Sequence, residues 1–261
     1  MAEDVVVVEV VDRAATMTLN RPEVRNALNG ELRTAILDIG RQLDADDSVD
    51  VIILTGADPA FCAGLDLREL SSGENNLSRT VSDEGQRRVP FPNTRKPVIG
   101  AINGVAVTGG LELVLNCDFL VASEHARFAD THARVGVQPG WGMTVLLPQA
   151  IGLRRAKEMS ATGNYIDANT ALSWGLVNHV VPHAELLPFC RRLAADIVSN
   201  DSAGVQAMFE TYDEGSETTA AEAWTVESRN ARRWLEAGGG RGEDIAKRRE
   251  AIQARGKSQA S

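Results

Sequence analysis

The first fifty residues show two different spacings of apolar positions. Valine dominates residues 5–11, and a second β-rich stretch at residues 15–19 follows after a short polar turn, which predicts a β-hairpin. From Asn29 onward the apolar residues recur every three or four positions, which predicts a helix with Asn29 as its N-cap. The apolar positions of this helix are Leu32, Ile36, Ile39 and Leu43.

Three later segments are continuously apolar and too short for helices. They lie at residues 51–54, 97–102 and 119–122. Such runs are typical of strands buried on both faces, and helical patterns between them indicate a largely parallel sheet. The pattern therefore predicts an α/β fold.

The rest of the chain is less regular until residue 141. Residues 70–95 are rich in Ser, Asn, Gly, Glu and Arg, and we interpret them either as a partly helical segment over a site or as an ordinary surface loop. After Trp141 the pattern is mainly helical, and the tryptophans at 174, 224 and 234 are expected to be packing residues. Without a repeat or a linker, residues 1–261 are predicted to form a single domain.

Composition narrows the class of protein. The 261 residues are 43% hydrophobic, enough for a sizeable core, and the net charge of -9 with scattered basic residues argues against a nucleic-acid partner. The three cysteines lack metal or CxxC spacing, so no metal is expected and a reducing compartment fits. No apolar run approaches the roughly 20 residues of a membrane span. We therefore expect no membrane partner and a cytoplasmic location.

Small residues follow the first buried strand, in the segment Ala60-Phe61-Cys62-Ala63-Gly64-Leu65-Asp66-Leu67. Small side chains let a backbone approach a ligand closely, so the N–H of Ala63 is a candidate donor to a substrate oxygen. A tight strand-to-helix turn explains the same composition.

A second segment, residues 103–113, combines a turn with the start of an apolar helix. Asn103-Gly104 marks the turn, and Gly109-Gly110 opens the helix. Glu112 follows Gly109 by three positions and so lies on the same helical face. A helix N-terminus favours an oxygen that becomes negative, so Gly109 and Glu112 could serve one pocket. The alternative for Glu112 is a favourable charge at a helix start.

Nucleotide-binding loops are excluded by spacing. Residues 104–110 lack G-x-G-x-x-G, and the chain contains no G-x-x-x-x-G-K-[ST] sequence.

Several motifs together resemble the crotonase superfamily, the enoyl-CoA hydratase/isomerase family, over about residues 5–182. In chain order they are Asn20-Arg21-Pro22-Glu23, Arg25-Asn26-Ala27-Leu28, the segments at 60–67 and 103–112, Pro139-Gly140-Trp141-Gly142, Ala161-Thr162-Gly163, Ile166-Asp167-Ala168 and Gly175-Leu176-Val177-Asn178. Each piece is weak alone, but the ordered set is specific.

The resemblance implies a crotonase-like spiral of ββα units over about residues 1–182 and a helical C-terminal trimerisation region over about residues 183–261. It implies an acyl-CoA thioester as the ligand, no cofactor beyond the coenzyme A of that substrate, and a homotrimer or a dimer of trimers. The expected function is hydration of a 2-enoyl-CoA.

The resemblance also implies roles for individual residues. The N–H groups of Ala63 and Gly109 are expected to hold the thioester oxygen, with Gly110 beside them. Trp141 stands where the family usually has a small residue and is expected either to narrow the acyl pocket or to be a core residue. The residues expected to line the coenzyme A channel are Arg25, Ala27, Leu28, Gly64, Leu65, Asp66 and Leu67, with Arg25 either a phosphate ligand or a surface cation.

One position departs from the family pattern. Glu112 matches the first of two catalytic glutamates, but His132 stands in place of the second. A histidine can donate or accept a proton near neutral pH, so Glu112 and His132 could still form an acid/base pair. Asp130 is either a substitute carboxylate or a turn cap. A double-bond isomerase and a non-catalytic acyl-CoA binding protein remain alternatives to a hydratase.

Overall fold

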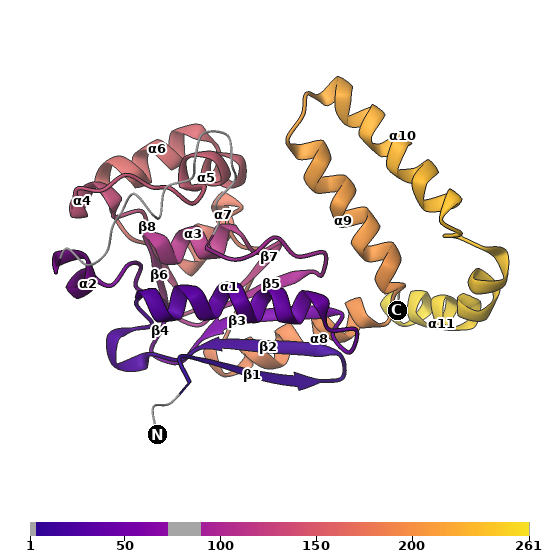
Figure 1. Cartoon of the computed structure of the whole chain (residues 1–261), viewed down its shortest axis with the longest axis horizontal. Coiled ribbons are helices and arrows are strands. Elements are labelled where there is room, and N and C mark those ends of the chain that lie inside the picture. Colours follow the sequence, from indigo (N-terminus) through magenta and orange to yellow (C-terminus); the bar gives the residue numbers. More distant parts are fainter. Residues whose placement is uncertain (1–3, 73–89, 261) are drawn as a thin grey trace. The chain divides into compact units, whose positions relative to one another are not determined.

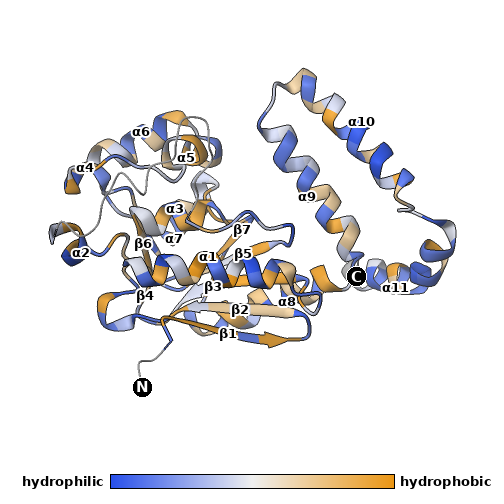
Figure 2. Cartoon of the chain, viewed as in Figure 1, coloured by the Kyte–Doolittle hydropathy of each residue, from blue (hydrophilic) through white to orange (hydrophobic). Residues whose placement is uncertain are grey.

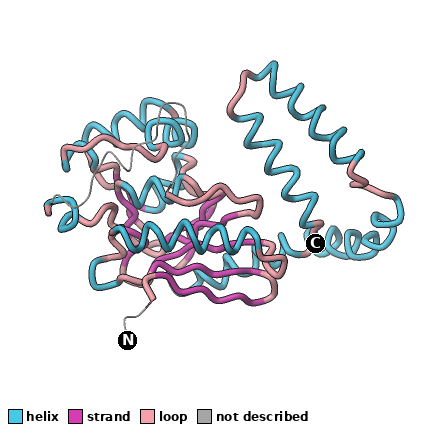
Figure 3. Tube along the Cα trace, in the orientation of Figure 1, coloured by secondary structure: helices cyan, strands magenta, loops and turns pink. Residues whose placement is uncertain are grey.

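The computed structural model describes residues 4–72 and 90–260. The chain forms two compact units, Met1–Asn200 and Asp201–Ser261, which are described separately. The predicted segment at residues 70–95 lies largely outside the described residues. Figure 1 and Figure 3 show strands only in the first unit.

The N-terminal hairpin is confirmed. β1 (Val6–Val11) pairs antiparallel with β2 (Ala14–Leu19), and η1 (Pro22–Val24) follows. α1 (Gly30–Ala45) begins as predicted, because the Asn29 side chain accepts a hydrogen bond from the Leu32 N–H at 2.9 Å.

The predicted buried strands form the centre of a six-stranded sheet in the order β1-β2-β3-β5-β7-β10. The central neighbours are parallel, as predicted. The later members of the sheet are β3 (Val51–Gly56), β5 (Val98–Ile102), β7 (Phe119–Ser123) and β10 (His179–Val181).

Each face of this sheet packs on a different helix. Ile52 and Leu54 belong to the core that includes Leu32 and Ile36 of α1. Val51 and Ile53, which alternate with them, belong to a second core with Leu186, Cys190 and Ala194 of α8 (Leu186–Val198). In Figure 1, α1 and α8 lie on either side of the strands. Burial on both faces explains why these strands are continuously apolar.

A second, four-stranded sheet carries the segments with candidate chemistry. Its order is β4-β6-β8-β9. The strands are β4 (Ala60–Cys62), β6 (Val105–Val107), β8 (Arg127–Ala129) and β9 (Ile166–Asp167). Short helices follow three of these strands directly: α2 (Leu67–Ser71), α3 (Gly109–Leu115) and α4 (His132–Val135).

The remaining elements of the first unit are helical, as the pattern after Trp141 predicted. They are α5 (Met143–Ile151), α6 (Leu153–Thr162), α7 (Ala168–Trp174) and η3 (His183–Glu185).

The second unit consists of α9 (Ser202–Ser216), α10 (Ala220–Glu236) and α11 (Gly242–Ala260). A capping box between Thr219 and Glu222 starts α10. Figure 2 shows that apolar residues alternate with polar ones along these helices. Tyr212 is 75% exposed and Trp224 is 72% exposed, so the expectation that Trp224 is a packing residue is wrong for the single chain.

Candidate active site

The two segments predicted to share a pocket lie against each other. Gly64 has φ +86°, and a methyl group on it would lie 3.4 Å from the Gly109 nitrogen and 2.9 Å from the Val107 carbonyl oxygen. Only glycine tolerates this φ and this close approach together. The turn after β4 therefore touches the start of α3.

The N–H of Ala63 is already used. It donates to the Arg25 carbonyl oxygen at 3.0 Å. This hydrogen bond joins the turn after β4 to the turn after η1. Its donor is therefore occupied, which argues against the expected contact between Ala63 and a substrate oxygen.

Leu65, two residues further on, presents a different N–H. Its neighbours both bond to Leu28: the Leu28 N–H donates to the Gly64 carbonyl at 2.8 Å, and the Asp66 N–H donates to the Leu28 carbonyl at 3.2 Å. Since successive N–H groups of an extended chain point to opposite sides, the Leu65 N–H points away from Leu28. Within residues 4–72 and 90–260 it has no hydrogen-bond acceptor.

Gly109 is the first residue of α3, so its N–H has no partner inside the helix. The residue before it, Thr108, has φ 54° and ψ -120°, an unusual conformation for a non-glycine residue. The Thr108 N–H donates to the Ala129 carbonyl at 3.1 Å, and its hydroxyl hydrogen-bonds with that of Thr131. These bonds hold the start of α3 against the turn that carries His132.

Glu112 is buried, with 2% of its surface exposed. Its Oε1 accepts hydrogen bonds from the N–H groups of Trp141 at 2.8 Å and Met143 at 3.4 Å. Its Oε2 lies 3.5 Å from the Nε2 of His132. One carboxylate oxygen is thus held by backbone, and the other faces the imidazole.

His132 lies between two carboxylates. Its Nδ1 is 2.7 Å from Asp130 Oδ1, and the same oxygen accepts the His132 backbone N–H at 3.1 Å. Asp130 therefore does cap the turn, and it also binds the imidazole. His132 is 4% exposed and Asp130 2% exposed.

The charges of this group are coupled. Burial by itself lowers the pKa of His132. The hydrogen bond with Asp130 and the Glu112 carboxylate raise the pKa by more than burial lowers it, and the result is a pKa of about 9. For Asp130, burial raises the pKa, but hydrogen bonds with His132 and Ser160 outweigh burial and lower it. At neutral pH the group therefore holds an imidazolium beside the Asp130 carboxylate.

The Trp141 side chain packs against the first residue of α3. A methyl group on Gly109 would be 3.1 Å from Cζ3 of the Trp141 ring and 3.4 Å from Cδ1 of Leu28. The Trp141 carbonyl accepts a hydrogen bond from Asn116 at 3.4 Å, and the residue is 8% exposed. The indole is packed in the core and also borders Gly109, so both expectations for it fit this position.

The other predicted residues are distributed around this centre. Gly110 packs on β4, since a methyl group there would lie 2.2 Å from the Cys62 carbonyl oxygen, so it has no room for a ligand. Asp66 is paired with Arg21 at 3.2 Å and caps α2. Leu67 is 61% exposed, Arg25 is exposed, and Ala27 is buried.

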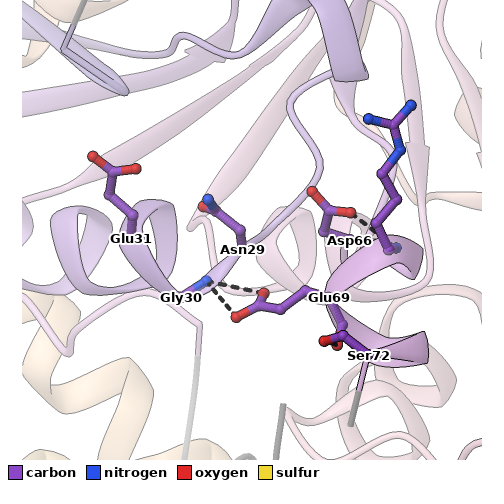
Figure 4. Close-up of a pocket in the computed structure, with 7 residues that line it drawn as sticks. Asn29, Gly30, Glu31, Asp66, Glu69 and Ser72 are labelled. Atoms are coloured by element: carbon purple, nitrogen blue, oxygen red, sulfur yellow. Dashed lines mark hydrogen bonds between the residues drawn. The ribbon is translucent and has the colours of Figure 1, made fainter. Parts of the chain in front are cut away.

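A cavity of about 430 Å³ opens nearby, between the N-terminal ends of α1 and α2 (Figure 4). Both oxygens of Glu69 accept the Gly30 N–H at 3.1 Å. Neither Glu112 nor His132 lines this cavity. Its lining is acidic, which does not suit phosphate groups. The lining residues are Asn29, Gly30, Glu31, Asp66, Arg68, Glu69 and Ser72.

Two asparagines that the sequence did not single out as ligands support the site. Asn26 is fully buried, and its amide donates to the carbonyl oxygens of Ala57 at 2.8 Å and Ala60 at 2.7 Å. Asn103 donates to Asp58 at 2.8 Å and accepts the Gly56 N–H at 3.4 Å. Both lie in motifs that carried the family resemblance, and their function there is structural.

Metal and membrane features were searched within residues 4–72 and 90–260. That part of the chain has no group of three or more His, Cys, Asp or Glu side chains placed to hold a metal ion. It also contains no helix with the length and apolarity that a membrane span requires.

Comparison with known proteins identifies the family to which the chain is related. Residues 11–238 match the enoyl-CoA hydratase/isomerase family model. The chain is 37% identical to a probable peroxisomal enoyl-CoA hydratase of Arabidopsis thaliana over 95% of this chain and 92% of that protein. It is 34% identical to a crotonyl-CoA hydratase of Syntrophomonas wolfei, over 87% of this chain and 88% of that protein.

Solved structures agree with the family match. The enoyl-CoA hydratase of Mycobacterium tuberculosis H37Rv superimposes with a TM-score of 0.75 at 50% identity, covering 88% of this chain and 98% of that one. The crotonase-like α/β fold expected from the sequence is therefore confirmed. The chain belongs to the enoyl-CoA hydratase/isomerase family.

Proposed function

We propose that this protein is an enoyl-CoA hydratase, a hydro-lyase that adds water across the double bond of a 2-enoyl-CoA thioester. One observation carries the proposal: Glu112 Oε2 and His132 Nε2 lie 3.5 Å apart, with Glu112 on the first turn of the helix that begins at Gly109, whose N–H has no partner within that helix. Hydration of a 2-enoyl thioester needs a general base, a general acid and donors that stabilise an anion, and Glu112, His132 and the helix start at Gly109 can supply them.

The thioester oxygen binds at the start of α3 in this proposal. The Gly109 N–H supplies one hydrogen bond, and the Leu65 N–H supplies the second in place of the occupied Ala63 N–H. Removal of one such donor in other enzymes costs about 3 to 4 kcal/mol of transition-state stabilisation. The contact between Gly64 and Gly109 supports this pairing because it brings the two backbone segments together.

In this proposal Glu112 accepts one proton and His132 donates another. Glu112 Oε2 takes a proton from water, whose oxygen bonds to the β-carbon. The electron pair of the double bond moves toward the thioester oxygen and forms an enolate. His132 then gives its Nε2 proton to the α-carbon, which restores the thioester carbonyl and leaves a 3-hydroxyacyl-CoA.

The same geometry allows both side chains to return to their starting protonation states. After the reaction Glu112 is protonated and His132 is neutral. Because Oε2 and Nε2 are 3.5 Å apart, the proton passes from Glu112 to His132 directly or through one water. No cofactor is needed in this cycle, since the coenzyme A is part of the substrate.

Trp141 limits the size of the acyl pocket in this proposal. Its ring lies over Gly109, beside the place of the thioester carbonyl. A large indole there leaves less space than a small residue, which favours a short acyl chain. Arg25 is exposed and remains the proposed contact for the coenzyme A phosphates.

The assembly and location are also proposals. Exposed aromatic side chains on α9 and α10, Tyr212 and Trp224, are better buried against another copy of the chain, which supports a homotrimer or a dimer of trimers. A cytoplasmic location fits the three free cysteines of the described chain, Cys62, Cys117 and Cys190.

An isomerase is the second candidate. Glu112 and His132 lie close enough to each other to move a proton between two carbons of one substrate without water. A non-catalytic acyl-CoA binding protein is less well supported, because both proton-transfer groups are in place.

The test uses the purified full-length protein with crotonyl-CoA. A hydratase lowers the absorbance of the conjugated thioester and produces 3-hydroxybutyryl-CoA. An isomerase leaves crotonyl-CoA unchanged but converts a 3-enoyl-CoA to the conjugated isomer, whose absorbance rises. Binding of butyryl-CoA without turnover of either substrate supports a binding protein and overturns the proposal.

A further inference from the structure

A buried aspartate on the far side of the imidazole takes no direct part in the proton transfers proposed above. Asp130 Oδ1 lies 2.7 Å from His132 Nδ1, whereas Glu112 faces the other ring nitrogen, Nε2. Both carboxylates are almost completely buried, with exposed fractions of 2%. The imidazole therefore lies between two acids that contact opposite edges of the ring.

This arrangement restricts the tautomer of His132. An ionised carboxylate accepts hydrogen bonds but does not donate them. Nδ1 must therefore carry the proton that Asp130 accepts, and Nε2 is left as the nitrogen that loses and regains a proton. Without the carboxylate, the neutral ring could place its proton on either nitrogen.

The arrangement also restricts the charge and position of the ring. The charged groups that face His132 in the described chain are Glu112 on α3 and Asp130 before α4, while Ser160 on α6 contacts Asp130. Two nearby carboxylates favour the imidazolium. Asp130 Oδ1 also accepts a hydrogen bond from the His132 backbone N–H at 3.1 Å, which fixes the backbone of His132.

We infer that Asp130 is a positioning residue that holds His132 in the orientation, tautomer and charge state from which Nε2 donates its proton to the α-carbon, an inference that rests on the proposed hydratase function. Asp130 and His132 together replace a single carboxylic acid as the proton donor. The negative charge of Asp130 is useful only because position 132 is a histidine.

A charge-only variant separates this role from that of the turn cap. Asp130→Asn keeps an oxygen that can accept the His132 backbone N–H, and asparagine is as good a cap as aspartate, but it removes the negative charge. An opposite charge at this distance moves a pKa by about 1 to 3 units, so we expect the pKa of His132 to fall by that amount in Asp130→Asn. Nitrogen-15 NMR of labelled histidine measures this pKa and the tautomer without any substrate.

Turnover gives the second readout. In the unaltered protein kcat should fall as pH rises through about 9, because the imidazolium is then lost. In Asp130→Asn the fall should begin at lower pH, with kcat at pH 7.5 reduced by up to about 30-fold as the imidazolium fraction decreases and KM little changed. Asp50→Asn is the matched control, since Asp50 is a buried aspartate paired with Arg13 at the start of β3. It should leave the pH profile of kcat unchanged.

The effect should disappear when position 132 cannot donate a proton. In His132→Gln no proton donor is left for Asp130 to act on, so adding Asp130→Asn should leave the residual kcat unchanged, whereas it lowers kcat when His132 is present. A residue with only a structural role would lower activity in both backgrounds.

Two results overturn the inference. One is a His132 pKa near its ordinary value of about 6.5 that does not respond to Asp130→Asn. The other is a loss of kcat of equal size with His132 and with His132→Gln. Either result leaves the hydratase proposal standing if crotonyl-CoA is hydrated. If the unaltered protein hydrates no enoyl-CoA, the proposed function fails, and the NMR titration still shows whether Asp130 controls the charge of His132.

Discussion

The indole of Trp141 covers Gly109, the first residue of α3. A methyl group on Gly109 would lie 3.1 Å from the Cζ3 atom of the ring, and Trp141 also donates its backbone N–H to Glu112 at 2.8 Å. One loop residue thus contacts the proposed oxyanion donor through its side chain and the proposed general base through its backbone.

Trp141→Leu should change the preference for acyl chain length. The smaller side chain keeps the backbone N–H to Glu112 but opens space beside Gly109. We expect kcat/KM for an eight- or ten-carbon 2-enoyl-CoA to rise relative to crotonyl-CoA by about tenfold, as expected from a pocket enlarged by one or two methylene groups. Trp174→Leu is the control, because Trp174 ends α7 and stacks on Arg155, outside the proposed site. An unchanged ratio would show that the indole is only a core residue.

Gly110→Ala should destabilise the protein without any direct effect on the substrate. The added methyl group would lie 2.2 Å from the Cys62 carbonyl oxygen, so α3 must move away from β4. Overpacking of this kind costs about 1 to 3 kcal/mol or more, measurable as a lower midpoint of urea or thermal unfolding. Gly256→Ala, where the new methyl group meets nothing within 4 Å, should stabilise α11 by up to about 1 kcal/mol. Equal effects of the two substitutions would contradict the close packing at Gly110.

Glu112→Gln tests the general base. The glutamine keeps an oxygen for the N–H groups of Trp141 and Met143 but cannot accept a proton from water. We expect kcat for crotonyl-CoA to fall by about 10²- to 10⁴-fold, the usual contribution of general acid/base catalysis. Calorimetric binding of butyryl-CoA should be nearly unchanged. Retention of full activity would remove Glu112 from the mechanism.

His132 should make stability depend on pH in a defined window. Its pKa is raised to about 9 in the folded protein, so the folded state binds the proton more tightly than the unfolded chain, whose pKa is about 6.5. The resulting stabilisation is fully present below about pH 6.5 and is lost as pH rises through about 9. It amounts to at most about 3 kcal/mol, at about 1.4 kcal/mol for each unit of pKa.

Urea unfolding of the protein and of His132→Gln at pH 6, 7.5 and 9.5 measures this contribution. The difference in unfolding free energy between the two proteins should shrink as pH rises. The comparison with the variant removes the effect of other groups that titrate in the same range. A difference that is constant with pH would contradict a charged His132.

Much of the fold could be predicted from local pattern. The continuously apolar runs gave the strands of the six-stranded sheet, since residues buried on both faces must be apolar whatever their partners are. The N-cap Asn29 and the spacing of Leu32 and Ile36 predicted α1, because capping and helical periodicity act within a few residues. The position of Glu112 three residues after Gly109 predicted a shared helical face for the same reason.

The site required the tertiary structure. Whether Ala63 or Leu65 has a free N–H depends on carbonyl groups of Arg25 and Leu28, which are far away in the chain and come near only when the turns pack together. The place of Trp141 over Gly109 likewise depends on the packing of the loop before α5 on α3. Local spacing carries no information on these directions.

The sequence by itself therefore determined the α/β class, the main elements and the candidate pair Glu112 and His132, in which His132 stands in place of the second glutamate of the family pattern. Only the tertiary structure decided that His132 lies between two carboxylates, Glu112 on α3 and Asp130 before α4. The physical reason is that burial and periodicity act on each segment separately, whereas hydrogen-bond direction and the charge of a buried group are set by neighbours from other segments.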